Sequence, residues 1–349
     1  MSIRLIAKRC PALAVAFAFA LLISALATAT LQAQEENTAA QAEMMVDSLP
    51  EMPIGITSFG GALCQDHIYV WGGHDGAAHE YYRSGQNATL YRLNIVDGKE
   101  WEKVHEDEQG RQGLAMVSYD GNLYRLGGFQ ARNKRGDDQD LHSVSTFDMF
   151  DPESGEWTEL SPMPEPRSSF DAVVHGDKLY VMGGWSMQGS ENSKWSETAW
   201  SIDLSSMKPE WQELPAPPFT RRALSVSFSG DNLYAIGGMQ KTGGPTRRVD
   251  VFNTKTNEWT VGPELPGEQG MEGFGNSSFN IGGRLCVTTY GGHVYSLSDA
   301  GDEWNKMGTL ETGRFFHRLL PIADDKFALF GGANMESGKT TDVEVITIK

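Results

Sequence analysis

A six-residue motif recurs along this chain at a nearly constant interval. It consists of an apolar residue, usually followed by tyrosine, two more mostly apolar residues and a pair of glycines. Clear copies occupy residues 68–73, 123–128, 179–184, 233–238 and 327–332, and the first four begin 55, 56 and 54 residues apart. A regular period of this length is typical of a chain built from stacked structural repeats.

A sixth, degenerate copy fills the gap between residues 238 and 327. Residues 285–288 align with its apolar half, but Thr289 and Tyr290 stand where the glycines belong, and Gly291 and Gly292 follow two residues late. The chain therefore contains six repeats.

Each repeat has the composition of a small antiparallel sheet. The 39 glycines and nine tryptophans favour many short strands joined by tight turns. Five repeats carry one tryptophan near their end, namely Trp101, Trp157, Trp211, Trp259 and Trp304. Residues 150–157 and 252–259 place an aromatic residue, a turn and this tryptophan at a fixed spacing.

Together, the paired glycines, the turn and the tryptophan resemble the kelch repeat over residues 44–349. The resemblance implies an all-β, six-bladed β-propeller, in which aromatic side chains fill the space between blades. The expected blades span about 54–104, 111–160, 167–214, 221–265, 272–310 and 314–349 plus 44–49.

The last repeat ends before a fourth strand can form. Residues 45–53 align with residues 156–164, which are the fourth strand and exit of the second repeat. We therefore expect the N-terminal strand to close the last blade and to cover a sheet edge that would otherwise be exposed.

The first 29 residues predict an export signal. Arg4, Lys8 and Arg9 precede an apolar run at residues 12–27, and small residues at 27–33 suit cleavage. An uncleaved anchor is the alternative, but the run is shorter than the roughly 20 residues that span a bilayer. We expect export to a periplasmic or extracellular location, a flexible linker at 30–43, and no stable membrane insertion after cleavage.

The charge of the chain argues against a nucleic-acid partner. The net charge is −17, and loss of the three cations of the signal brings it to −20. Such a surface repels nucleic acid and anionic membranes.

The two cysteines outside the signal are predicted to stay unpaired. The repeat register places Cys64 on the inner strand of blade 1 and Cys286 on the second strand of blade 5, with blade 6 between them. A disulfide needs Cα atoms within about 7 Å of each other.

Candidate ligand-binding residues gather on one face of the expected propeller, where each first strand begins and where the loop after each glycine pair lies. These residues are Arg111, Arg167, Arg221, Arg222, Arg314, His317, His74, His79, Tyr81, Phe129 and Trp185.

Two interpretations of these residues remain open. The arginines suit a carboxylate, sulfate or phosphate, or they brace loops by pairing with acidic neighbours. The aromatic residues suit stacking against a sugar ring, or they pack the loops. The histidines lack the spacing of a metal site, so no metal and no cofactor is expected.

The chain also resembles one enzyme family. The chain resembles exported N-acetylneuraminate epimerases, which are sialic-acid mutarotases, in its signal, its six repeats and its closing segment at residues 331–347. The resemblance carries over only Gly313 and Arg314, and this chain lacks the family's long mid-chain insertion. The copper oxidases related to galactose oxidase also use a kelch propeller, but their radical site needs a tyrosine–cysteine crosslink near the copper. Both cysteines here lie within predicted strands, so the resemblance to these oxidases is limited to the propeller.

Two functions therefore stay open. The first is an exported module that binds a carbohydrate, an anionic small molecule or an extracytoplasmic protein. The second is a sugar-acid mutarotase or epimerase, in which a deep pocket would hold a carboxylate or histidine against the sugar.

Overall fold

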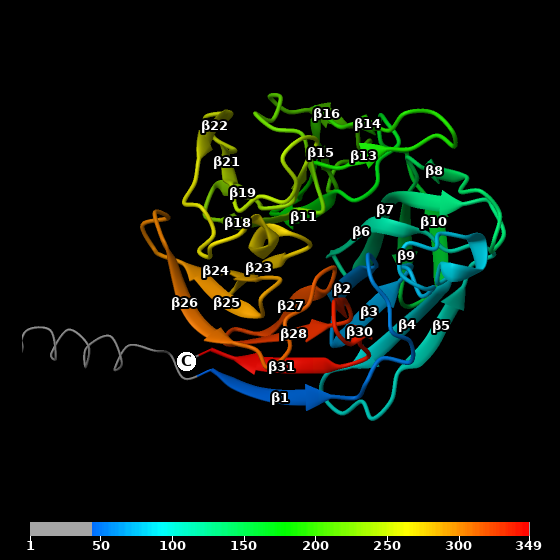
Figure 1. The fold of residues 1–349 in the computed structure, drawn as a ribbon, viewed down its shortest axis with the longest axis horizontal. Helices are drawn as coiled ribbons and strands as arrows, with labels where there is room; N and C mark the ends of the chain where they lie inside the picture. The colour runs from blue at the N-terminus through cyan, green and yellow to red at the C-terminus, as the bar shows by residue number, and fades with distance from the viewer. Residues whose placement is uncertain (1–43, 349) are drawn as a thin grey trace, which may run out of the picture. The chain divides into compact units, whose positions relative to one another are not determined.

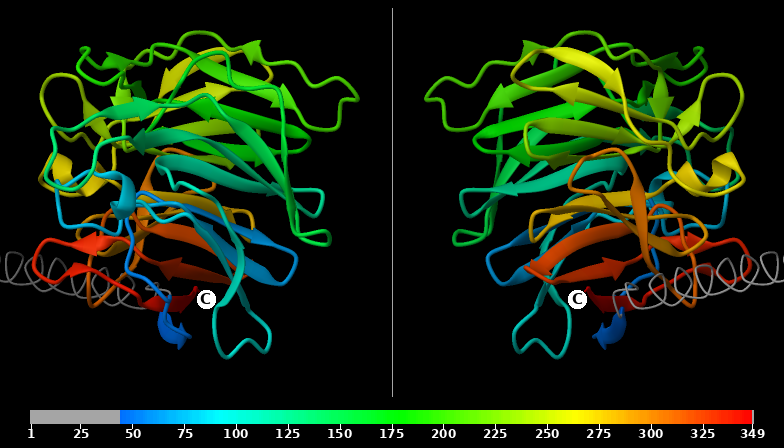
Figure 2. Two further views of the ribbon diagram at one scale, coloured as in Figure 1. Left: turned by 90° about the vertical axis from the view of Figure 1, so that its right-hand side faces the viewer. Right: turned by 90° about the vertical axis from the view of Figure 1, so that its left-hand side faces the viewer.

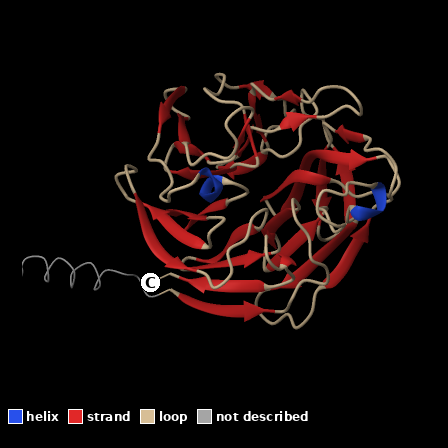
Figure 3. Cartoon of the chain, viewed as in Figure 1, coloured by secondary structure: helices blue, strands red, loops and turns tan. Residues whose placement is uncertain are grey.

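The computed structural model describes residues 44–348, and the predicted signal and linker lie outside them. The described chain is all-β, with two short 3-10 helices, η1 (Arg83–Gly85) and η2 (Gly270–Gly273). Figures 1 and 3 show its strands grouped around a common centre.

Six antiparallel sheets form the blades of a β-propeller, which confirms the predicted fold class. Blades 1 to 3 contain, from the innermost strand outward, β2 (Gly60–Cys64), β3 (His67–Trp71), β4 (Thr89–Asn94) and β5 (Glu102–Glu106); β6 (Gln112–Tyr119), β7 (Asn122–Ala131), β9 (Phe147–Asp151) and β10 (Glu156–Glu159); and β11 (Asp171–His175), β12 (Lys178–Met182), β15 (Ala199–Asp203) and β16 (Gln212–Glu213).

The remaining three blades follow the same order. They contain β18 (Ser225–Ser229), β19 (Asn232–Ile236), β21 (Val249–Asn253) and β22 (Glu258–Val261); β23 (Ser277–Ile281), β24 (Arg284–Thr288), β25 (His293–Leu297) and β26 (Trp304–Thr309); and β27 (Arg318–Ala323), β28 (Lys326–Phe330), β31 (Val343–Thr347) and β1 (Met45–Leu49).

The N-terminal strand closes blade 6, as the sequence predicts. β1 pairs antiparallel with β31, with Met45 opposite Thr347 and Leu49 opposite Val343. Figure 1 shows the two strands, blue and red, side by side at the edge of the last blade. The ends of the described chain therefore complete one sheet.

Tryptophans join neighbouring blades through a repeated hydrogen bond. In four blades the indole Nε1–H donates to a carbonyl in the exit segment of the preceding blade. The pairs are Trp101 with Pro50 (2.9 Å), Trp211 with Ser161 (3.1 Å), Trp259 with Pro215 (2.9 Å) and Trp304 with Pro263 (2.8 Å). Because Pro50 follows β1, the N-terminal segment occupies the same place as the exits of blades 2, 3 and 4.

The paired glycines are required by close approach of backbone. Gly72 has φ +73°, and a Cβ there would lie 2.6 Å from the carbonyl oxygen of Arg111 in the next blade. Gly73 N–H donates to that same oxygen at 2.8 Å. A side chain would therefore break a contact between blades.

Loops between the second and third strands lie on one face of the propeller. Figure 2 shows η1, η2 and the hairpin of β29 (Ala333–Asn334) and β30 (Gly338–Lys339) on that side. Blade 5 is the exception, because Thr289 N–H donates to His293 O and closes a tight turn in place of a long loop. This turn explains the displaced glycine pair of the degenerate repeat.

Both cysteines are free and buried, in β2 and β24 as predicted. Burial raises the pKa of the Cys64 thiol to about 11 and that of Cys286 to about 12. A thiol reagent should therefore react slowly with the native protein and fully after unfolding, and the unreduced unfolded chain should keep the mass of two free thiols. A Cys64–Cys286 disulfide in the mass spectrum would contradict the blade order.

Candidate functional site

Four of the predicted arginines form a buried framework. Arg111, Arg167, Arg221 and Arg314 are each at most 5% exposed, and each Nη1 donates to the carbonyl of the first glycine of its own blade's pair. Their carboxylate partners are Asp148, Glu165, Asp250 and Glu344. These contacts are the ones expected if the arginines brace the loops by pairing with acidic neighbours.

A ring of backbone hydrogen bonds narrows the central channel of the propeller below the face that carries the loops. One residue per blade takes a left-handed conformation, and its N–H donates to the carbonyl of its counterpart in the preceding blade. These six ring residues are Ser58, Gly113, Ser169, Ala223, Gly275 and Phe316, with N···O distances of 2.7–3.4 Å. We call this ring the neck.

A cavity of about 410 Å³ opens above the neck, and we call it the mouth cavity. Loop residues of blades 1, 2 and 3 contribute Tyr81, Phe129 and Trp185 to its wall, and the start of blade 4 contributes Arg222. Tyr81 meets Phe129 edge-to-face at 6.0 Å between ring centres. The structure thus brings four of the predicted residues, from four blades, to one cavity.

Arg222 differs from the framework arginines in its partners. Its guanidinium lies over Trp185, 4.3 Å from the ring centre, and 5.7 Å from the ring centre of Trp195. Burial lowers its pKa, and no carboxylate of residues 44–348 acts on it. Arg222 is therefore a cation held by aromatic faces in a strongly acidic protein.

Three nitrogen donors on the cavity wall lack an acceptor among the described residues. They are Gln112 Nε2, Trp185 Nε1 and Arg222 Nε. Gln112 is only 2% exposed. Each buried donor without a partner costs roughly 1–3 kcal/mol. The framework arginines Arg167, Arg221 and Arg314 carry a buried, unpaired Nε in the same way.

The three predicted histidines do not line the mouth cavity. His74 is buried behind Tyr81, 5.2 Å between ring centres, and burial lowers its pKa. His79 is exposed on the loop. Within residues 44–348, no three His, Cys, Asp or Glu side chains gather closely enough to hold a metal ion.

His317 lies deeper, beside the neck. It lines a small cavity of about 50 Å³, and its Nε2 lies 2.6 Å from Thr288 Oγ1. Burial lowers its pKa to about 3. The imidazole of His317 takes up a proton near pH 6.5 in the unfolded chain but only near pH 3 in the folded one. Protonation therefore favours the unfolded chain, and the free energy of unfolding falls as the pH falls from about 6.5 toward 3.

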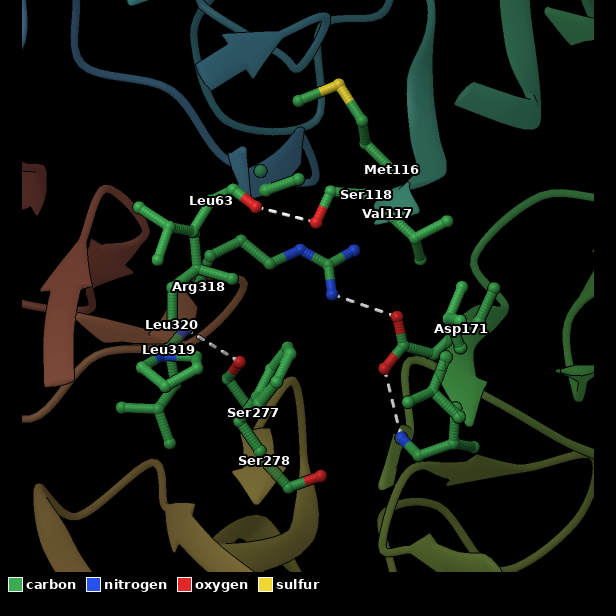
Figure 4. Close-up of a pocket in the computed structure, with 18 residues that line it drawn as sticks. Leu63, Met116, Val117, Ser118, Asp171, Ser277, Ser278, Arg318, Leu319 and Leu320 are labelled. Carbon is green, nitrogen blue, oxygen red and sulfur yellow. Dashed lines mark hydrogen bonds and ion pairs between the residues drawn. The ribbon is translucent and has the colours of Figure 1, made fainter. Parts of the chain in front are cut away.

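An axial chamber of about 280 Å³ lies on the other side of the neck. Figure 4 shows Arg318 of β27 reaching across it to Asp171 of β11, with Nη1 and Oδ1 2.9 Å apart. Arg318 also donates to the carbonyls of Phe59 and Leu114, and Asp171 Oδ2 accepts from Val226 N–H. The pair is satisfied within the protein and ties opposite blades together.

Sequence reasoning missed Gln112 and Phe316, which line the mouth cavity, and Trp195, which lies beside Arg222. Gln112 follows a framework arginine as Arg222 does, so the repeat register could have found it. Trp195 comes from the strand β14 (Lys194–Trp195), which pairs with β13 (Trp185–Ser186), and no motif marks it. Phe316 enters the wall because it belongs to the neck.

Comparison with known proteins agrees with the repeat pattern. The profile of the KLHDC2/KLHL20/DRC7 Kelch-repeats domain matches residues 59–292 and 145–332. The chain belongs to the kelch-repeat family. A solved structure of YjhT has the same fold as this kelch-repeat protein, with a TM-score of 0.69, 20% identity, and coverage of 86% of this chain and 97% of that one.

The similar curated proteins fall into two groups. N-acetylneuraminate epimerase of Haemophilus influenzae (strain PittEE) is 24% identical over 76% of this chain and 80% of its own length. Kelch-like protein 35 of Mus musculus is 26% identical over 62% of this chain, which spans only 33% of that protein.

Residues 44–348 include no helix with the length and apolar character needed to cross a membrane.

Proposed function

We propose that this kelch-repeat protein binds a carboxylate-bearing sugar in the mouth cavity, and that it does so outside the cytoplasm. The observation that carries the proposal is Arg222, a cation on the cavity wall that has no carboxylate partner among residues 44–348 and lies against the rings of Trp185 and Trp195. Its guanidinium suits a carboxylate, and the neighbouring aromatic faces suit the apolar C–H surface of a sugar ring.

The other groups on the wall support the same ligand chemistry. Gln139 and Ser193 also line the cavity and carry N–H and O–H donors, and a sugar acid carries many oxygen acceptors. Tyr81 and Phe129 add two aromatic side chains to the wall. A neutral hydrocarbon ligand would offer none of these donors an acceptor.

Mutarotation of a sugar acid is the second candidate, and the similarity to N-acetylneuraminate epimerases favours it. In this reaction the anomeric hydroxyl loses a proton, and the bond between the anomeric carbon and the ring oxygen breaks as that oxygen gains a proton. The ring then re-closes on the other face of the resulting carbonyl, with both proton transfers reversed. Proton transfer of this kind is usually assisted by a carboxylate or a histidine. The residues that line the mouth cavity include neither, so binding without chemistry fits the cavity better.

A thermal-shift screen tests the proposal with matched pairs. Galacturonic acid, glucuronic acid and N-acetylneuraminic acid would be compared with galactose, glucose and N-acetylmannosamine, and with sulfated glycans. A ligand at 100 times its Kd stabilises a protein by about 2.7 kcal/mol, which corresponds to several degrees in Tm. At least one acid should raise Tm while its neutral counterpart does not.

Two other outcomes of the screen have distinct meanings. If no acid shifts Tm at millimolar concentration, the proposed function is wrong. If N-acetylneuraminic acid binds and the protein also speeds the interconversion of its anomers, followed by proton NMR, the mutarotase candidate replaces simple binding.

A further inference from the structure

We propose that the ligand is an acidic oligosaccharide whose next sugar stacks on an aromatic cluster beside the mouth cavity. The cluster consists of Phe274, Tyr290, Phe315 and Phe316 from blades 5 and 6. The inference rests on the proposed function, because the acidic sugar itself would lie against Arg222.

Six equivalent positions at the rim divide the loop face into two halves. Each position immediately precedes a neck residue, and the six residues are Thr57, Gln112, Ser168, Arg222, Phe274 and Phe315. The positions in blades 1 to 4 are polar or cationic, and those in blades 5 and 6 are phenylalanines. Thr57, Gln112 and Ser168 are buried, so Arg222 presents a charge on one side of the rim and the two phenylalanines present rings on the other.

The cluster is continuous with the mouth cavity through Phe316. Phe316 lines the cavity and lies 5.3 Å from Phe315 and 5.0 Å from Phe274, measured between ring centres. Tyr290 stacks on the far side of Phe315, at 5.8 Å with 18° between ring planes. A ligand that starts at Arg222 must extend beyond the cavity to reach these rings.

Phe316 has an unusual conformation for a bulky residue. Its φ is +55°, whereas the other five neck positions, all left-handed, hold only serine, glycine or alanine. A left-handed non-glycine residue costs on the order of 1–2 kcal/mol, and such strain concentrates at ligand sites. The presence of a phenylalanine at this position despite the cost indicates that its ring has a function at the rim.

The tight turn of blade 5 leaves the cluster uncovered. Blades 1 to 3 place loop residues over the axis, but blade 5 turns back at residues 289–292, where Thr289 Oγ1 donates to Glu272 of η2. All four rings of the cluster stay half-buried. The rings therefore keep exposed apolar surface that suits the apolar face of a pyranose, so we expect a carbohydrate rather than a longer aliphatic acid as the occupant.

The test compares an acidic monosaccharide with the same sugar in a longer chain, by isothermal titration calorimetry. The probes are N-acetylneuraminic acid with sialyllactose, and galacturonic acid with trigalacturonic acid. The variants are Phe315→Ala and Tyr290→Ala. Phe279→Ala is the control, because Phe279 is also a half-buried phenylalanine of blade 5 but lines the axial chamber.

We expect the longer chain of one pair to bind about 3- to 10-fold more tightly than its monosaccharide. Phe315→Ala and Tyr290→Ala should remove this advantage and leave the monosaccharide affinity unchanged, and Phe279→Ala should keep it. Thermal melts identify a variant that no longer folds. If one of the two variants fails in this way, the other one alone tests the inference.

Equal affinity for both members of the pair would overturn the inference and leave the proposed function intact. Equal weakening of both members by Phe315→Ala would also overturn it. If no probe binds the unaltered protein, the proposed function fails and the inference fails with it.

Discussion

Replacing Arg221 with alanine should lower the free energy of unfolding by about 3–5 kcal/mol. Arg221 and Asp250 are 1% and 0% exposed, and their charged atoms lie 2.7 Å apart. The change leaves the buried carboxylate with only Arg248, and it also removes the donor to the carbonyls of Gly237 and Arg248. Because Arg248 remains, we expect the lower part of this range.

Arg222 provides the matched control for this variant. It is the next residue in the chain and carries the same charge, but it has no carboxylate partner among the described residues and lies on the cavity wall. Urea denaturation should show a large loss for Arg221→Ala and a small one for Arg222→Ala. Equal losses would mean that Arg222 is also part of the framework.

Removal of residues 44–53 should cost even more, because it opens the ring. The deletion takes β1 away from β31, removes the carbonyl of Pro50 that accepts from Trp101, and removes Met52, which is 3% exposed. Loss of a buried methionine side chain alone costs about 2–5 kcal/mol. The uncovered edge of β31 should also pair with other copies of the chain and cause aggregation.

A chain that starts at residue 44 is the control for the deletion. Melting temperature and light scattering of the two chains would be compared at equal concentration. If the shorter chain melts at the same temperature and stays monomeric, closure of blade 6 by the N-terminal strand does not contribute to stability.

The sequence could predict the fold because the repeat is a local pattern with strict geometric causes. Gly72 must be glycine because backbone of the next blade lies against it, and in four blades the tryptophan donates to the blade before it. The alignment of residues 45–53 with the exit of blade 2 predicted the ring closure for the same reason. These contacts repeat, so they leave a periodic trace.

The sequence could not separate the roles of the arginines. Arg221 and Arg222 are adjacent residues of the same type. Only the alternation of side chains along the strand directs Arg221 into the blade and Arg222 toward the cavity. Three of the four carboxylate partners also lie about 30 residues or more away in the chain, as Asp250 does from Arg221, and only Glu165 is near its arginine. Trp195 depends on a loop hairpin that occurs in one blade, so no repeat could indicate it.

Calorimetric titration of Arg222 variants would show whether Arg222 holds the carboxylate of a sugar acid, as we propose. The ligand would be the acid that raises Tm most in the screen, with its neutral counterpart alongside. Arg284→Ala is the control, because Arg284 is an exposed cation at the start of β24, on a hairpin away from the mouth cavity.

We predict that Arg222→Ala weakens binding of the acid by about tenfold to a hundredfold, since one charge-assisted hydrogen bond contributes about 1.5–3 kcal/mol. Arg222→Lys should restore only part of this loss, because lysine keeps the charge without the planar fork that stacks on Trp185. Arg284→Ala should bind as the unaltered protein does. If Arg222→Ala binds the acid with unchanged affinity, the mouth cavity is not the site.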